Sequence, residues 1–287
     1  MAPELRNWEI DLEVMNEGKR GAPYLYPDSL FTFLGFLHVR CGSDFRSLEG
    51  FLRKLSEFIP SLRVPDYTTI CRRFNTLNLN IVETLDEFDS DGITISIDAS
   101  GIKVANRGDW IRKVWKIRRG WIKVHLAVEH ETKQVVSIQV TNEKVGDSTM
   151  FKSVLLDAKK NVERKNNHIK QVNCDGSYDT KENFNLSKKL EITPAIKIRE
   201  NASSKSKGSP TRAQHVREYK TIGYKEWSKN YNYGKRWDVE GKFSSVKRLM
   251  GESVRATKIC NMVNEVRLKF LYHNLLTKYD SVGYIPW

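Results

Sequence analysis

Hydrophobic residues recur at helical spacing through the first 90 residues, where the period-two alternation of strands is absent. One predicted helix is capped by Asp28-Ser29, and a second begins at Ser43 or Asp44. After Pro60 and the turn at Pro65-Asp66, residues 67–77 predict a short basic helix.

The last two of these predicted helices resemble a helix-turn-helix, in which a tight turn precedes a second helix that reads DNA. Here that second helix carries Arg72 and Arg73. The alternative is an ordinary helical bundle whose arginines are solvated. The pattern fixes the helices but leaves both interpretations open.

The pattern changes at Asp91-Gly92, where Ile93 to Ile97 alternates with period two and predicts a half-buried strand. The elements predicted from here are strands at 93–97, 122–128, 135–140, 169–174 and 192–198, and helices at 148–160 and 180–190. This order, β-β-β-α-β-α-β, predicts an α/β layered domain with a mixed sheet. Residues 199–213 are small, polar and basic and predict a mobile loop, after which helices resume near Tyr219 and continue to about Tyr279.

The chain has 48 Lys and Arg against 35 Asp and Glu, a net charge of +13. Such an excess indicates a phosphate-rich partner, although it does not separate DNA from RNA, and a merely basic soluble protein is the alternative. The four cysteines are scattered without a C-x-x-C pair, which argues against a zinc site and a disulfide framework. There is no leader after Met1 and no apolar stretch long enough for a bilayer, so we expect a cytoplasmic, nucleoid-associated protein without membrane contact.

Three acids lie at informative positions. Asp98 is predicted to end the first strand and Asp175 the fourth, at the sheet edge where α/β proteins commonly build their sites. Glu240 lies on a predicted helix face between Arg236 and Lys247. Taken alone, a strand-end Asp is commonly a turn residue or helix cap, and Arg236 with Glu240 is an ordinary exposed pair one turn apart.

Together these residues resemble a known family. Residues 233–247 read Tyr-x2-Arg-x3-Glu-x6-Lys, the Y-R-E-K signature of the IS4/IS5-type DDE transposases. The stretches around Asp98 and Asp175, together with residues 101–128, are similar to the IS5-like branch, and the similarity extends over roughly residues 20–280.

The resemblance implies an RNase H-like catalytic domain at 91–287, with an insertion around 199–230, behind a helical DNA-binding domain at 1–90. It implies that Asp98, Asp175 and Glu240 are catalytic and hold two Mg²⁺ (or Mn²⁺) ions. Such ions prefer carboxylate oxygens and can activate the attacking oxygen and stabilise the leaving one at a phosphodiester. Water would free a 3′-OH at the transposon end, and that hydroxyl would attack target DNA directly.

The resemblance also implies DNA contacts. Tyr233, Arg236 and Lys247 would contact phosphates of the transposon end. Trp237 would stack on a displaced base, with a role in the core as the alternative. The helices bearing Arg72 and Arg73 would bind the terminal inverted repeats. The partners would be double-stranded DNA and a second copy of the chain in a synaptic homodimer.

Three points are left open. The basic stretch 107–123, with its interleaved tryptophans, either follows a DNA backbone or forms a hairpin edge packed on the sheet. Asp179 is interpreted as a helix N-cap, and Asp147 has no assigned role. The rival functions are an RNase H-like nuclease or resolvase without strand transfer, and a DNA-binding regulator with a decayed site. The presence of all three acids argues against decay.

Overall fold

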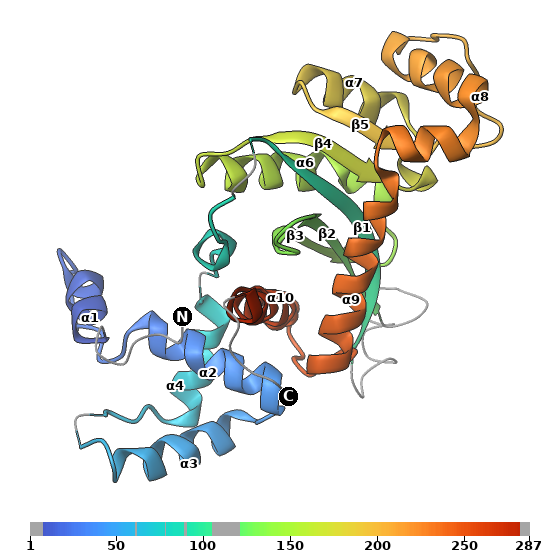
Figure 1. Cartoon of the computed structure of the whole chain (residues 1–287). Helices are drawn as coiled ribbons and strands as arrows, with labels where there is room; N and C mark the ends of the chain where they lie inside the picture. The colour runs from blue at the N-terminus through green and yellow to red at the C-terminus, as the bar shows by residue number, and fades with distance from the viewer. Residues whose placement is uncertain (1–7, 61, 78, 89–90, 105–120, 282–287) are drawn as a thin grey trace.

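The computed structural model describes residues 8–281 except 61, 78, 89–90 and 105–120. Figure 1 shows the N-terminal helices at one end of the molecule and α7, β5 and α8 at the other. The N-terminal elements are α1 (Trp8–Asn16), α2 (Asp28–Cys41), α3 (Phe45–Ser56), α4 (Tyr67–Thr76) and the 3₁₀ turn η2 (Ile81–Thr84).

The sheet that follows has the order β3-β2-β1-β4-β5. Its strands are β1 (Ile93–Val104), β2 (Trp121–Glu129), β3 (Val135–Asn142), β4 (Ile169–Cys174) and β5 (Thr193–Ile196), with a two-residue strand β6 (Ser253–Val254) beside the end of β1. The first three strands are antiparallel, whereas β4 and β5 run parallel to β1. This is the mixed sheet of an RNase H-like fold, as predicted.

Helices and short 3₁₀ turns connect and cover the strands. They are α6 (Asp147–Glu163), η3 (Gly176–Tyr178), α7 (Lys181–Lys189), α8 (Pro210–Asn230), η4 (Tyr233–Arg236), α9 (Trp237–Met250) and α10 (Ile259–Ser281). Helix α9 carries apolar residues at Val239, Phe243 and Val246, which are buried at helical spacing. It therefore presents one apolar face to the sheet and runs alongside β1 (Figure 1).

The sheet alternation decides which side chains face α9. In β1, Ile93, Ile95 and Ile97 join the core under α6 and α7, whereas Ile102 and Val104 join the core under α9 and α10. Successive strand residues point to opposite faces. The even-numbered positions of β1, which include residue 98, therefore lie on the α9 side of the sheet.

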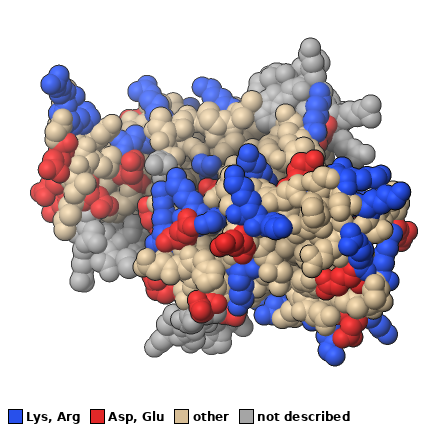
Figure 2. Space-filling model, turned by 90° about the horizontal axis from the view of Figure 1, so that it is seen from above, with Lys and Arg blue, Asp and Glu red and all other residues tan. Residues whose placement is uncertain are grey.

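On the face drawn in Figure 2, the described Lys and Arg side chains are spread out with Asp and Glu among them, rather than gathered in one patch. Within the described part of the chain, none of the helices combines the length and the apolar character needed to cross a bilayer.

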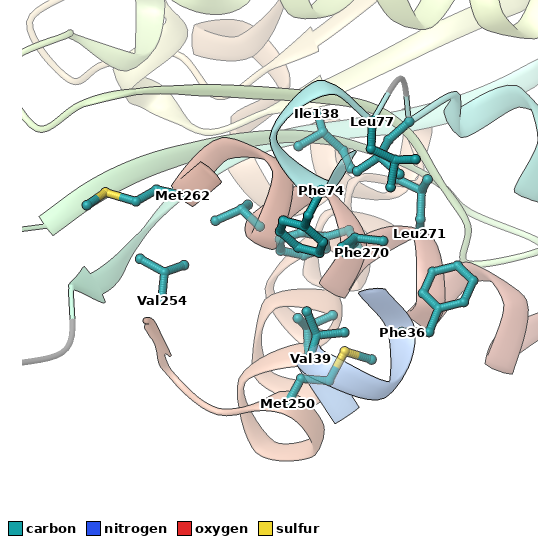
Figure 3. Packing of buried hydrophobic residues seen from close by; sticks show 14 of the residues in the cluster. Phe36, Val39, Phe74, Leu77, Ile138, Met250, Val254, Met262, Phe270 and Leu271 are labelled. Carbon is teal, nitrogen blue, oxygen red and sulfur yellow. The ribbon is translucent and has the colours of Figure 1, made fainter. Parts of the chain in front are cut away.

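The N-terminal helices share their hydrophobic core with the sheet. Figure 3 shows Phe36 of α2 and Phe74 of α4 packed near Ile138 of β3 and Phe270 of α10. The same cluster includes Met250 of α9. Helix α10 contacts α2, α4, α9 and β3, so it fills the space between the helical segment and the sheet. The helical segment and the sheet, which meet at the predicted boundary near residue 90, are thus in close contact.

Several boundaries differ from those predicted. Strand β1 continues past Asp98 to Val104 because it pairs with β2 as far as Lys103 and with β6 at Lys103 and Val104, so the prediction that Asp98 ends the strand is wrong. Helix α8 begins at Pro210 rather than near Tyr219. Ser209 caps it by accepting a hydrogen bond from the Arg212 backbone N–H, and proline is well suited to a first helical turn.

The start of the chain also shows two differences. Asp44 caps α3 as predicted, by accepting from the Ser47 amide, but α2 begins after Pro27 without a side-chain cap. Helices α3 and α4 are joined by residues 57–66 rather than by a tight turn. Of the basic stretch 107–123, only residues 121–123 lie within the described residues.

Candidate active site

Asp98 and Asp175 come from neighbouring parallel strands. Ile97 of β1 is in register with Cys174 of β4, so each aspartate directly follows a paired residue. Asp98 lies within β1, whereas Asp175 lies just past β4 and caps η3 by accepting from the Ser177 amide at 2.8 Å. The strand register therefore brings the two aspartates side by side at the point where β4 ends next to β1, although Asp98 does not end its strand.

Glu240 approaches the same region from α9. Its carboxylate pairs with the Arg236 guanidinium one turn earlier, at 2.6 Å. The same guanidinium lies 3.7 Å from the Asp98 carboxylate. Arg236 is thus a cation between two of the three predicted ligands. The ordinary one-turn ion pair is present, and it is part of the site.

The electrostatics of Asp98 show that the three acids influence one another. The pKa of Asp98 is raised to about 6, chiefly by burial and further by the negative charges of Asp175 and Glu240. The backbone N–H of Ala99 and the charge of Arg236 oppose this rise. A cluster in which acids raise the pKa of a neighbouring acid is stabilised by cations, and it lies where the oxygen-rich donor set suits a hard divalent ion.

The side chains as they stand do not form a ligand group. Among the described residues, no three His, Cys, Asp or Glu side chains are arranged to hold a metal ion. In this arrangement the Glu240 carboxylate is paired with Arg236. The donor chemistry therefore fits a divalent metal, provided that Arg236 releases Glu240.

Tyr233 and Lys247 are held by contacts within the protein. The Tyr233 ring is buried and its hydroxyl donates to the carbonyl oxygen of Cys174, at 2.9 Å. Lys247 donates to the Ser100 hydroxyl, at 2.8 Å. The pKa of Lys247 is lowered, chiefly by burial, with Glu252 opposing the change and Lys103 adding to it. The first contact ties η4 to the residue before Asp175, and the second ties α9 to β1 two residues after Asp98.

A cavity of about 850 Å³ opens beside these groups. Its lining includes Asp175, Arg236, Trp237, Arg199 and Tyr224. The Trp237 side chain is 65% exposed and its ring lies against the Arg236 guanidinium, at 5.0 Å. The alternative of a core role for Trp237 is therefore wrong. Its neighbour Val239 faces the core instead, because the helical period turns residue 237 outward.

The two arginines of α4 lie in different surroundings. Arg72 is exposed. Arg73 pairs with Asp28 at 2.6 Å and stacks against the rings of Tyr24 and Phe31, at 4.7 and 4.9 Å. Arg73 therefore joins α4 to the segment that begins α2, far from the three acids.

Two further acids have clear positions. Asp147 begins α6 and pairs with Lys123 of β2 at 2.7 Å. Asp179 is not the N-cap of α7, which is Thr180. Its buried carboxylate accepts two hydrogen bonds from Arg212 of α8, at 2.6 and 2.9 Å. The N-cap prediction was wrong because a basic residue 33 positions away takes this carboxylate, and no local pattern reveals that contact.

Matches to known families decide the identity. A family model described as "Transposase DDE domain" matches residues 89–275, well over half of the chain, and a second model with the same description matches residues 3–107. The chain belongs to the DDE transposase family. It is a DNA-cleaving and strand-transferring enzyme of DNA transposition, as the sequence predicted. The family also implies the use of divalent metal.

Solved structures of transposases are among those similar to this DDE transposase. A piggyBac transposase synaptic complex with hairpin DNA is 12% identical, has a TM-score of 0.46, and is matched over 96% of this chain and 73% of that one. The Drosophila P element transposase strand transfer complex is 12% identical, with a TM-score of 0.33 and coverage of 96% and 86%. The family assignment rests on the family models.

Proposed function

We propose that Asp98, Asp175 and Glu240 are the catalytic residues of this DDE transposase and hold two Mg²⁺ or Mn²⁺ ions. The observation that carries the proposal is that Asp98 lies beside Asp175 across the Ile97–Cys174 register and shares the Arg236 guanidinium with Glu240. When bound, the ions would supply activation of the attacking oxygen and stabilisation of the leaving one.

In this proposal Arg236 changes partner during the reaction. In the free protein it neutralises Glu240 and lies close to Asp98. When DNA arrives, its guanidinium would turn to a phosphate of the cleaved strand, which it can bind with two parallel hydrogen bonds. That movement would free Glu240. Arg236 thereby keeps the three acids from repelling one another until the substrate replaces it.

We further propose that Trp237, which lines the cavity, and Lys247 contact DNA. Trp237 has the exposure that base stacking requires, and Lys247 supplies a positive charge next to Ser100. Tyr233 would act chiefly by holding η4 against β4, since its hydroxyl is already engaged. Arg72 is the better candidate on α4 for the inverted repeats, with Arg73 positioning that helix.

Two finer points belong to the same proposal. We propose that the protein forms a homodimer in the synaptic complex, because two transposon ends must be held together. We also propose that it acts on chromosomal DNA in the nucleoid. The assignment to the IS5-like branch remains a prediction from the residues around Asp98, Asp175 and Glu240.

The test is a cleavage and joining assay with a labelled duplex of the transposon end, a plasmid target and Mg²⁺. Asp98→Asn, Asp175→Asn and Glu240→Gln are each expected to abolish cleavage while the affinity for the duplex, measured by gel shift, is retained. Glu252→Gln, which removes an exposed acid paired with Lys103, is the matched control and is expected to cleave normally. Retained cleavage in any one of the three variants would refute the role of that acid. Nicked ends without joined product would favour a nuclease.

A further inference from the structure

A buried chain of hydrogen bonds links the strand that leads to Asp175 with the helix that carries Glu240. Its centre is His130, which follows β2 and is 2% exposed. One ring nitrogen, Nδ1, lies 2.7 Å from the carboxylate of Asp238 on α9. The other, Nε2, lies 3.3 Å from the side-chain nitrogen of Asn173 on β4. The imidazole therefore bridges two elements that are 65 positions apart in the sequence (Asn173 to Asp238).

The neighbouring contacts fix the direction of every bond in this chain. Gln171 donates a side-chain N–H to the side-chain oxygen Oδ1 of Asn173, at 2.8 Å. The side-chain nitrogen Nδ2 of Asn173 therefore faces His130. That nitrogen is a donor, so Nε2 of His130 must accept and Nδ1 must carry the proton that is donated to Asp238. Lys133 donates to the same Asp238 oxygen at 2.8 Å. Each polar group is thus paired with a group of complementary type.

The same series of hydrogen bonds also holds residues 231–238, which lead into α9. The Gln171 side chain also donates to the backbone carbonyl of Tyr231, at 2.7 Å. Tyr231 and Asp238 stand on either side of the turn and helix start that carry Arg236 and Trp237. Residues 231–238 are therefore fastened to β4 at one end through Gln171 and at the other through His130.

These hydrogen bonds lie close in sequence to two of the three acids, so they can affect the geometry of the proposed metal site. Asn173 of β4 lies two residues before Asp175, and Asp238 lies two residues before Glu240 on α9. A metal site requires its ligands to be held within about 0.5 Å of the working geometry by their surroundings. A charge-assisted bond to Asp238 restrains α9 along its axis, which apolar packing alone restrains weakly.

We infer that His130 is a positioning residue that sets the distance between Asp175 and Glu240 by bridging Asn173 and Asp238. This inference rests on the proposed role of those two acids as metal ligands. In this role His130 contacts neither DNA nor metal. The residue acts by holding α9 in register with β4, so its loss weakens metal binding before it weakens DNA binding.

The test compares His130→Leu with His130→Gln in the full chain bound to the transposon-end duplex. Leucine fills the space of the imidazole but forms neither hydrogen bond. The glutamine side chain can donate its N–H to Asp238 and accept from Asn173 at its oxygen. Mn²⁺ binding is followed by electron paramagnetic resonance of the free ion. We expect His130→Leu to raise the half-saturating Mn²⁺ concentration by about 10- to 100-fold, the range seen when groups supporting metal ligands are removed. His130→Gln is expected to recover most of that loss, and duplex affinity is expected to stay unchanged in both.

Asn274→Leu is the matched control. Asn274 is also fully buried and bridges α10 to Val135 and Thr84, away from the three acids. It is expected to lower the melting temperature while leaving Mn²⁺ binding unchanged. If His130→Leu does not fold, Asp238→Ala removes the other end of the bridge from a more exposed position and is expected to shift Mn²⁺ binding in the same direction.

Each outcome separates this inference from the proposed function. Loss of Mn²⁺ binding in Asp98→Asn and Glu240→Gln, together with normal binding in His130→Leu or Asp238→Ala, would overturn the inference alone. An equal shift in Asn274→Leu would overturn it as well, because general destabilisation would then explain the effect. Normal Mn²⁺ binding in Asp98→Asn and Glu240→Gln would overturn the metal site itself.

Discussion

Adjacent arginines of α4 have different surroundings although they have the same chemistry. Arg73 is largely covered by Tyr24 and Phe31 and pairs with Asp28, whereas Arg72 is exposed. The Asp28 side chain is 54% exposed, so the ion pair contributes little and the ring contacts contribute most of the stabilisation. We therefore regard Arg73 as a structural residue of the helical segment.

This difference predicts that alanine at residue 73 affects mainly stability, whereas alanine at residue 72 affects mainly DNA binding. Arg73→Ala is expected to lower the free energy of unfolding by about 1–2 kcal/mol through the lost cation–π contacts. Arg72→Ala is expected to change it by less than about 0.5 kcal/mol and to weaken binding of the transposon end. Urea unfolding and gel shifts measure the two effects. If Arg73→Ala lowers the free energy of unfolding no more than Arg72→Ala does, the ring contacts of Arg73 add no stability beyond that of an exposed arginine.

At the scale of elements, one buried ion pair fastens the inserted helix to the catalytic sheet. Asp179 follows η3, only a few residues after Asp175, and its side chain is fully buried. Arg212 in the first turns of α8 binds it with two hydrogen bonds, and the backbone N–H of Arg199 donates to it as well. Helix α8 is thus joined to the segment that follows Asp175.

Removal of Arg212 is expected to have a large effect. Arg212→Ala leaves the Asp179 carboxylate buried without its cation and is expected to cost about 3–5 kcal/mol of stability. Arg217→Ala, on the same helix and exposed, is the control and is expected to cost less than about 0.5 kcal/mol. Urea unfolding monitored by circular dichroism compares them. A small cost for Arg212→Ala would mean that water reaches Asp179 when the arginine is absent.

At the scale of the whole molecule, the shared core makes the N-terminal helices and the catalytic sheet depend on one another. Phe74 of α4 lies in the same cluster as Ile138 of β3 and Phe270 of α10 (Figure 3). Elements that bury their apolar faces against each other unfold together when neither can keep that surface dry alone.

We therefore expect Phe74→Ala to destabilise the entire chain in one transition, by about 3–5 kcal/mol. The helical signal at 222 nm and tryptophan fluorescence, to which the buried Trp227 of α8 contributes, are expected to change at the same urea concentration. Phe58→Ala is the control, since that side chain is 75% exposed. Two separate transitions, with helices lost first, would instead support an independent domain at residues 1–90.

The sequence alone was sufficient for the order of the main strands and helices, and it named the three acids as candidates. Period-two alternation located the strands, and its change to helical spacing located most helices, because these periods follow from backbone geometry. The spacing of Tyr233, Arg236, Glu240 and Lys247 was equally local, since all four lie within η4 and α9. These features depend on neighbours in the chain and can be inferred without knowing the fold.

Only the tertiary structure decided how these local features are used. The end of β1, the partner of Asp179 and the burial of Arg73 depend on residues from distant segments that cover or pair with them. The bridge from Asn173 through His130 to Asp238 joins three elements, and none of its members stands out in the sequence. Hydrogen bonds and packing between distant segments have no sequence period, so the pattern that predicted where Asp98, Asp175 and Glu240 lie gave no indication of what holds them together.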